Sequence, residues 1–302
     1  MKNNRVLILK DNYNSFEKYY LDKLNECSID AKFYYTSSSA LRKIFTHYAL
    51  PFESLWYGNW KKNLNAYDCI IVFDSLHSAN LLKYIRKSYR KRLIFWHWNP
   101  MKKDKDIAIW KETKEMCEHW TFNPKDAKKY GMGLNNQFFF YQNRENVSKE
   151  EAAFFVGVDK GRYEKLLAIS KSLKNIGVTV DFHIINMESN DNRKYVEKIY
   201  MEYDEVISHI RKSKAVVEMV QDGQNGLTAR ALEAMFFETK LITNNKMIRN
   251  FNFYNNHNIF IIGEDNNDSL DTFLHTPFQS IDRKDLYPYD ANGWINNFMR
   301  RK

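Results

Sequence analysis

Short apolar runs alternate with segments of helical periodicity through the first half of the chain. Runs of apolar residues at 6–10, 31–35, 69–73 and 93–96 are typical of buried strands in a parallel sheet. Further strands are expected at 120–122 and 138–141, and helices at 15–25, 78–88 and 126–130. This alternation predicts one doubly wound α/β domain over residues 1–145.

A second series of the same kind follows a polar segment at 142–151. This segment shows neither strand nor helix periodicity and is the predicted linker. Strands are expected at 154–158, 180–185, 215–219, 240–243 and 259–262, and helices at 163–176, 192–200 and from 227 onward. The second half therefore predicts another open parallel sheet, over residues 152–285. A short amphipathic helix is expected within 286–302, packed either on its own domain or back on the first.

Composition supports two buried cores. Of the 302 residues, 44% are hydrophobic and 16% aromatic, which excludes a disordered chain. The sequence lacks an apolar run of the roughly 18 residues that a membrane span needs, and its first apolar run is too short for a secretory signal. We therefore expect a cytoplasmic protein. Cys27, Cys69 and Cys117 form no CxxC pair and are expected to be reduced core residues.

The formal net charge is +9, with basic clusters at 86–92 and 300–302. Phosphorylated ligands, an anionic membrane surface or nucleic acid would each account for such a charge, and so would ordinary solvated helix faces. The chain has no zinc-finger spacing, RNP-like signature or long arginine-rich tract. We therefore do not expect nucleic acid as a partner.

The segment 216–245 carries polar chemistry at the start of a helix. A loop at 221–226 with two glycines follows a predicted strand, and Arg230 and Glu233 lie three residues apart on the helix behind it. Exposed amides and the helix dipole at such a site favour an anion. An ordinary strand-to-helix turn with an exposed ion pair is the alternative interpretation.

The turn 157–162 is the second candidate for anion binding, because it links the first strand of the second domain to its first helix. Its Lys160 and Arg162 are suited to neutralising two phosphates, although a basic surface loop is the alternative. Both turns follow strands whose carboxyl ends should share one sheet edge. We expect Gln224, Thr228 and the helix amides to hold a diphosphate there, and Glu233 to accept hydrogen bonds from ribose hydroxyls.

Three stretches resemble one family: FFVGVDKGR at 154–162, GQNGLTARALEA at 223–234 and KLITNN at 240–245. They are similar to motifs of the GT-B glycosyltransferases, in particular the type that builds bacterial lipopolysaccharide and capsule, and the resemblance covers about residues 153–263. It implies two Rossmann-like domains facing across a cleft, with a nucleotide-sugar donor in the second, an acceptor in the first, and no bound metal. It also implies that Gly226, Leu227 and Thr228 form the diphosphate loop and that Glu233 binds the ribose.

The sequence departs from the family at one position. Retaining members often carry two glutamates separated by seven residues, and Asn225 stands where the first of them would be. Glu218, Asp222 and Gln224 are the alternatives for contacting the sugar. Retention and inversion of the sugar configuration both stay open.

An inverting transfer needs a base to deprotonate the acceptor, and three side chains follow predicted strands of the first domain. They are Asp11, Asp74 and His97. His97 is preferred because its ordinary pKa lies nearest neutrality and because Trp96 and Trp98 are suited to stacking on a sugar. Packing is the alternative role for His97, and helix capping is the alternative for the two aspartates.

Four other histidines, His77, His119, His209 and His257, show no metal-ligand spacing, and we expect no zinc site. The predicted function is a metal-independent, hexosyltransferase-like glycosyltransferase without a cofactor. It would move a sugar from a nucleotide diphosphate or monophosphate to a glycan or lipid-linked acceptor in surface polysaccharide synthesis, in the cytoplasm or at the inner face of the membrane. The alternatives are a GT-B-fold nucleotide-sugar epimerase or hydrolase, and a non-catalytic nucleotide-binding or nucleic-acid-binding protein. No G-x-G-x-x-G follows the first strand, which disfavours a dinucleotide site there.

Overall fold

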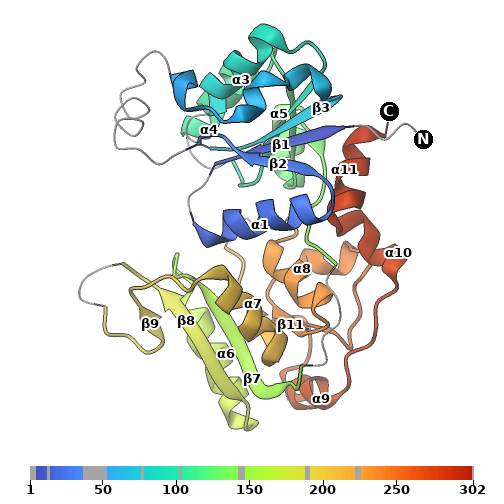
Figure 1. Cartoon of the computed structure of the whole chain (residues 1–302). Coiled ribbons are helices and arrows are strands. Elements are labelled where there is room, and N and C mark those ends of the chain that lie inside the picture. Colours follow the sequence, from blue (N-terminus) through green and yellow to red (C-terminus); the bar gives the residue numbers. More distant parts are fainter. Residues whose placement is uncertain are drawn as a thin grey trace. The chain divides into compact units, whose positions relative to one another are not determined.

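The chain folds into two compact units, Met1–Asn135 and Asn136–Lys302 (Figure 1). The computed structural model describes residues 5–11, 14–36, 53–75, 78–101, 104–141, 147–187, 191–221 and 226–300. The division between the units falls at Asn135, whereas the sequence pattern places the linker at 142–151.

The first unit is built on a six-stranded parallel sheet in the order β2-β1-β3-β4-β5-β6. Its strands are β1 (Val6–Lys10), β2 (Asp30–Phe33), β3 (Cys69–Phe73), β4 (Arg92–His97), β5 (Glu118–Thr121) and β6 (Gly133–Leu134). The helices are α1 (Ser15–Glu26), α3 (Ser78–Ser88), α4 (Asp104–Thr113) and α5 (Pro124–Tyr130), with three short 3₁₀ turns between Glu53 and Ala66. α1 and α3 lie on opposite sides of the sheet (Figure 1), as in doubly wound folds.

Burial on both faces explains the uninterrupted apolar runs of the first sheet. Every residue of β1 and β3 is buried. On one face, alternate residues of these strands, such as Leu7 and Ile70, pack against Leu81 and Ile85 of α3. The strands therefore cannot show the apolar and polar alternation of a half-exposed sheet.

The second unit repeats this plan, with strand order β12-β11-β10-β7-β8-β9, again all parallel. Its strands are β7 (Glu150–Val158), β8 (Thr179–Ile185), β9 (Val196–Glu197), β10 (Ser213–Glu218), β11 (Lys240–Thr243) and β12 (Ile259–Ile261). Its helices are α6 (Tyr163–Asn175), α7 (Tyr203–Lys212), α8 (Ala229–Phe236), α9 (Leu270–His275), α10 (Arg283–Leu286) and α11 (Ala291–Met299).

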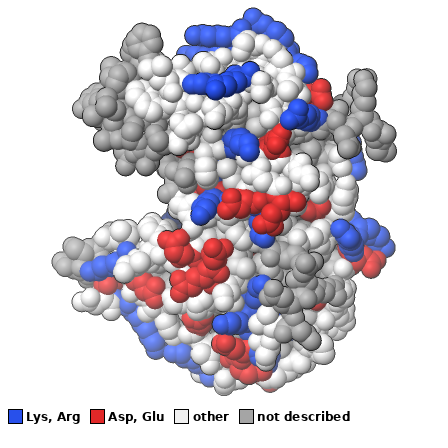
Figure 2. Space-filling view, in the orientation of Figure 1, with Lys and Arg blue, Asp and Glu red and all other residues white. Residues whose placement is uncertain are grey.

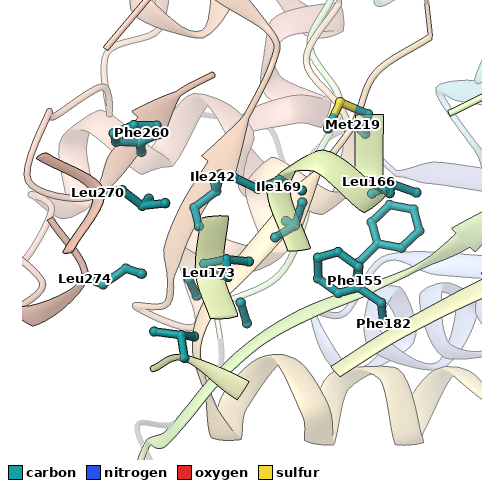
Figure 3. Close-up of a cluster of buried hydrophobic side chains, with 14 of the residues drawn as sticks. Phe155, Leu166, Ile169, Leu173, Phe182, Met219, Ile242, Phe260, Leu270 and Leu274 are labelled. Carbon is teal, nitrogen blue, oxygen red and sulfur yellow. The ribbon is translucent and has the colours of Figure 1, made fainter. Parts of the chain in front are cut away.

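The main core of the second unit lies between this sheet and helix α6 (Figure 3). Leu166 and Leu173 of α6 belong to one buried cluster with Phe155 of β7 and Phe182 of β8. Phe155 and Phe182 are neighbours in register across the two strands. Their sequence neighbours must therefore point to the other face of the sheet.

Two predicted elements differ from the structure. The helix predicted at 192–200 is wrong, because Val196 and Glu197 form strand β9, which pairs with β8, and the helix α7 begins only at Tyr203. The backbone pairing of this segment with β8, which forms only in the folded sheet, outweighs the local helical pattern. The segment 138–141 does not join the first sheet. It lies in the second unit, where Phe138 stacks on Trp294 of α11 at 4.3 Å between ring centroids.

The predicted fold class, two α/β domains that each contain a Rossmann-like parallel sheet, is confirmed. Among the described residues, no helix combines the length and the apolar character that crossing a bilayer requires. The three cysteines, all within the described residues, form no disulfide; Cys69 and Cys117 are buried as expected, whereas Cys27 is half-exposed. Burial raises the pKa of each buried thiol to about 12, so neither is a nucleophile at neutral pH.

Candidate functional site

The two predicted phosphate-binding turns follow neighbouring strands of the second sheet. β7 and β10 are adjacent and parallel, so the turn after Val158 and the segment after Glu218 leave the same edge of the sheet. Ligands of open α/β sheets bind at this edge, outside the carboxyl ends of the strands. The strand order thus brings together two segments that lie about 60 residues apart in sequence.

Arg162 ties these two segments to each other. Its Nη1 donates to the Met219 carbonyl at 2.6 Å, its Nε donates to the Asp159 carbonyl at 3.1 Å, and its Nη2 donates to the Val158 carbonyl. Burial lowers the pKa of the guanidinium from its ordinary value, although the group stays charged. Each nitrogen of Arg162 therefore holds a loop carbonyl, a positioning role that its sequence context does not reveal.

The start of helix α6 is closed by Asp159. Its Oδ1 accepts from the backbone N–H groups of Arg162 at 3.0 Å and Tyr163 at 2.9 Å, and its Oδ2 accepts from Arg193 at 2.8 Å. Two of the amides at the start of α6 are thus already used by a carboxylate. Lys160 is exposed, with a φ of +45°, in a left-handed conformation that a non-glycine residue adopts at a cost.

Helix α8 begins on a network centred on Glu218. Thr228 is the N-cap, whose Oγ1 accepts from the N–H of Ala231 at 3.3 Å and donates to Glu218 Oε1. Thr243 Oγ1 donates to the other oxygen of Glu218 at 2.5 Å. Burial raises the pKa of this carboxyl, which is only 4% exposed. Glu218, considered above for contacting the sugar, instead joins the helix start to β11.

Arg230 and Glu233 project together, as their spacing on α8 predicts. Arg230 Nη1 lies 2.7 Å from Glu233 Oε2, and the hydroxyl of Tyr203 on α7 donates to Glu233 Oε1 at 2.5 Å. Glu233 is only 2% exposed, so the pair is not the solvent-exposed ion pair of the alternative interpretation. A buried carboxylate needs such partners, because leaving it unpaired costs several kcal/mol.

The remaining predicted donor residues lie in or beside the loop before α8. Gly226 and Leu227 are buried, and the Gly226 carbonyl accepts from Asn245 Nδ2 at 3.3 Å. Gln224 lies outside the described residues, as do Asp222 and Asn225. Lys160, Arg162 and the start of α8 therefore share one sheet edge, and Glu233 lies on the buried side of α8.

In the first unit, the three base candidates follow adjacent parallel strands. Asp11 comes after β1, Asp74 comes after β3, and His97 is the last residue of β4. Asp74 and His97 line a small cavity of about 50 Å³, together with Ser75, Phe95, Asn99, Lys105, Asp106 and Ile109. The carboxyl edge of the first sheet thus holds a cavity lined by both polar and apolar side chains, and Asp11, just after the neighbouring strand β1, is buried.

Asp74 has a pKa closer to neutrality than that of His97. Burial raises the pKa of its carboxyl to about 6, an effect that the nearby Lys10 ammonium opposes. Its Oδ2 accepts from the Asn99 backbone N–H at 3.1 Å. A carboxyl with this pKa exchanges a proton readily near neutral pH, which suits general base catalysis.

His97 is only 2% exposed and belongs to a buried chain of polar groups. Its Nε2 lies 2.9 Å from Nδ1 of His119, whose Nε2 lies 3.2 Å from Thr113 Oγ1. Burial, and then the neighbouring His119, lower the pKa of His97 to about 3. His97 is therefore neutral and weakly basic at pH 7, although it reaches the same cavity as Asp74.

Two further side chains change the expected picture of this edge. Trp96 is fully buried, so the expectation that it stacks on a sugar is wrong: residues alternate along β4 and Trp96 points into the core. Lys10, which the sequence motifs do not mark as a site residue, is a buried cation whose ammonium lies 4.4 Å from the Trp98 ring centroid. Its signal was a lysine that ends an apolar strand, and its charge faces the carboxylates of Glu17, Asp74 and Asp11.

Solved structures with full-length similarity to this chain share its architecture. HepE from Anabaena in complex with UDP-glucose has a TM-score of 0.61 and 8% identity, covering 98% of both chains. An alpha-glucosyltransferase in complex with UDP and a 13-mer DNA has a TM-score of 0.57 and 11% identity, covering 98% of this chain and 99% of its own. Sucrose-phosphate synthase from Thermosynechococcus elongatus has a TM-score of 0.57 and 7% identity, covering 97% of both.

No family model matches the sequence, and no match is found among curated proteins. The structural likeness extends over nearly the whole chain, so it covers both Rossmann-like units and not one of them alone. The chain therefore has the GT-B fold. At identities of 7% to 11% the likeness concerns the fold, and the reaction has to be argued from the residues.

Proposed function

We propose that this protein is a glycosyltransferase that moves a sugar from a nucleotide-sugar donor to a hydroxyl of a glycan or lipid-linked acceptor. One observation carries the proposal. In a chain with the GT-B fold, the turn after β7 and the segment after β10, which leads to α8, leave one sheet edge and are joined through the bond from Arg162 to Met219. The structures similar to it include proteins in complex with UDP-glucose and with UDP.

The donor is proposed to bind at this edge of the second unit. The N-terminal amides of α8 and the exposed Lys160 ammonium supply the positive potential that a diphosphate needs. Arg162 fixes the shape of the loops around it. Glu233 is proposed to meet the ribose, since a carboxylate held by Tyr203 and Arg230 retains lone pairs for further hydrogen bonds.

The acceptor is proposed to bind at the carboxyl edge of the first sheet, with Asp74 as the base. Its pKa of about 6 leaves the carboxylate ionised at neutral pH and able to take a hydroxyl proton. His97 lines the same cavity and is suited to hydrogen bonding as a neutral imidazole. A base acting on the acceptor corresponds to an inverting transfer. The transfer is proposed to need no metal.

The biological setting is proposed to be surface polysaccharide synthesis at the inner face of the membrane, on the basis of the motif resemblance and the net charge of +9. Part of that charge is used internally. Within 86–92, Arg86 donates to the carbonyls of Met116, Tyr89 and Lys91, and Arg92 forms a bidentate pair with Glu118. Figure 2 shows basic side chains in several separate groups, interspersed with acidic ones, on the face displayed.

A binding screen with UDP, GDP, CMP and ADP tests the donor site. Calorimetry on the wild type and on Glu233→Gln is expected to show one preferred nucleotide and at least tenfold weaker binding to the variant. Gln keeps the shape of the side chain while removing the charge that pairs with Arg230. Glu164→Gln, on the exposed side of α6, is the matched control and should bind like the wild type. If no nucleotide binds to the wild type, the proposal is refuted.

Product analysis separates transfer from the two alternatives. With the preferred nucleotide-sugar and no acceptor, a transferase should release little free sugar and no epimer, and turnover should require an added glycan or lipid-linked acceptor. Epimerised or hydrolysed sugar at full rate without acceptor would favour the epimerase or hydrolase. Tight nucleic-acid binding without nucleotide binding would favour the non-catalytic alternative.

A further inference from the structure

A second group of chemically active side chains lies on the face of the second sheet opposite to its main core. Asp181 and His183 are two residues apart on β8, so they point to the same side, while Phe182 and Ile184 point into the core. His209 reaches them from α7. Asp181 Oδ1 lies 2.9 Å from His183 Nε2, and Asp181 Oδ2 lies 2.7 Å from His209 Nδ1.

One potential ligand atom from each of the three residues lies within 4.8 Å of the other two. Two imidazoles and a carboxylate form a ligand set that divalent transition metals, zinc above all, bind readily. Tetrahedral zinc with bonds of about 2.0–2.1 Å would hold its ligand atoms roughly 3.3 Å apart. The present contacts of 2.9 and 2.7 Å run to the two different oxygens of Asp181, so side-chain rotations have to bring one ligand atom from each residue, now within 4.8 Å of the others, to this spacing.

A second carboxylate orients His183. Its Nδ1 lies 2.8 Å from Glu197 Oε1 on β9, which favours the tautomer with the proton on Nδ1. The lone pair of Nε2 then faces the Asp181 carboxylate, so either a second ring proton or a metal ion has to lie between the two atoms. Metal-binding histidines commonly donate their other N–H to a carboxylate in this way. A doubly protonated His183 is the competing arrangement.

The rings are also held in place by their neighbours. His209 stacks on Phe154 of β7 at 4.9 Å between centroids, and the rings of His183 and His209 lie 5.6 Å apart. The residues come from two strands and a helix, which position ligands better than loops do. Side-chain exposures of 28% for Asp181, 20% for His183 and 32% for His209 leave a way for an ion and a water to enter.

We propose that Asp181, His183 and His209 bind a divalent transition-metal ion of the zinc class, with Glu197 orienting His183. The site is separate from the proposed donor edge. Asp181 is paired in register with Phe154, and β7 continues four residues further to Val158, a distance of about 13 Å along the strand. The ion would fasten α7 to β8, and α7 also carries Tyr203, the partner of Glu233.

Metal titration of the full-length, tag-free protein, stripped of metal with a chelator, tests this site. Calorimetry with zinc is expected to show one tight site per chain, and zinc should raise the melting temperature. Asp181→Asn and His209→Gln should each weaken zinc at least 100-fold, and Glu197→Gln should weaken it about 10-fold to 100-fold, as is usual for an orienting carboxylate. His275→Gln is the matched control, because His275 forms an exposed pair with Asp271 at 3.1 Å; it should bind zinc like the wild type.

Cobalt substitution tests the same site without any variant. Cobalt(II) bound to wild-type protein should give the intense visible absorption of a four-coordinate ion, and added zinc should abolish it. A cobalt spectrum no stronger than that of the aqueous ion would overturn the proposal. Zinc affinity that is the same in the wild type, Asp181→Asn and His209→Gln would also overturn it and leave a protonated His183 as the cation of the cluster.

Discussion

Replacing Arg162 distinguishes a residue that shapes the donor loops from one that only supplies charge. The wild-type guanidinium donates to the carbonyls of Asp159, Met219 and Val158. Arg162→Met removes these donors, and Arg162→Lys keeps the positive charge on a single ammonium that cannot reach three carbonyls from one position. Both variants should therefore loosen the sheet edge, and to a similar degree.

The size of the effect follows from these contacts. A hydrogen bond from a charged donor contributes about 1.5–3 kcal/mol, so three would contribute roughly 5–9 kcal/mol if they were independent and fully buried. Arg162 is only half-buried, and water can replace part of each lost contact. We expect a loss of about 2–4 kcal/mol, which corresponds to a roughly 30-fold to 1,000-fold loss of amide protection in β7 and β10.

Hydrogen–deuterium exchange measured by mass spectrometry reports the loss of amide protection in the second unit separately from the first. Lys171→Met, on the exposed side of α6, is the control and should leave protection unchanged. Nucleotide affinity measured on the same variants should fall for both Arg162→Met and Arg162→Lys. If Arg162→Lys keeps wild-type protection and wild-type affinity while Arg162→Met loses affinity, the side chain acts through its charge on the phosphates and the bridging argument is refuted.

Three further perturbations test other parts of the molecule. Because burial raises the pKa of Asp74 to about 6, the carboxyl is protonated below that pH and ionised above it, so sugar transfer should increase as the pH rises through about 6. Asp74→Asn should lower the rate by about 100-fold or more and abolish this increase in rate with pH. If the increase persists in the variant, another residue is the base. Thr228→Val removes the α8 cap and a partner of Glu218, and should destabilise the second unit by about 1–3 kcal/mol in amide exchange, whereas Thr228→Ser should be nearly neutral. Trp294→Ala should cost about 3–5 kcal/mol and deprotect Phe138 together with the rest of the second unit; unchanged protection there would contradict the packing of residues 138–141 on α11.

The sequence predicted the strands well where they are buried on both faces. Continuous apolar runs such as CIIVF at 69–73 leave few alternatives to a parallel strand, and most of the predicted strands and several helices lie within a few residues of their observed positions. It failed at 192–200, where a helical pattern gives way to a two-residue strand that is held by its partner β8. It also missed α4, whose apolar residues are consecutive, at 107–110, and so do not show the spacing of a helical face. Short edge elements depend on partners that are distant in sequence, so local patterns cannot reveal them.

The candidate site likewise has features that the sequence predicted and features that only the tertiary structure shows. That Asp11, Asp74 and His97 would share a sheet edge follows from a topological rule and needs only the order of strands and helices. How buried each group is, and hence that Asp74 titrates near pH 6 while His97 titrates near pH 3, depends on what packs against it.

Composition is read directly from the sequence. The sequence by itself also determined the two α/β halves of this protein and the two polar turns that follow its strands, because short-range periodicity and turn chemistry are local properties. Only the tertiary structure decided that Arg162 reaches Met219, that Glu233 is buried against Tyr203, and that His209 meets His183 and Asp181. These contacts join residues about 26 to 57 positions apart. Their existence depends on strand order and helix packing, which bring distant side chains together at distances that spacing along the chain does not encode.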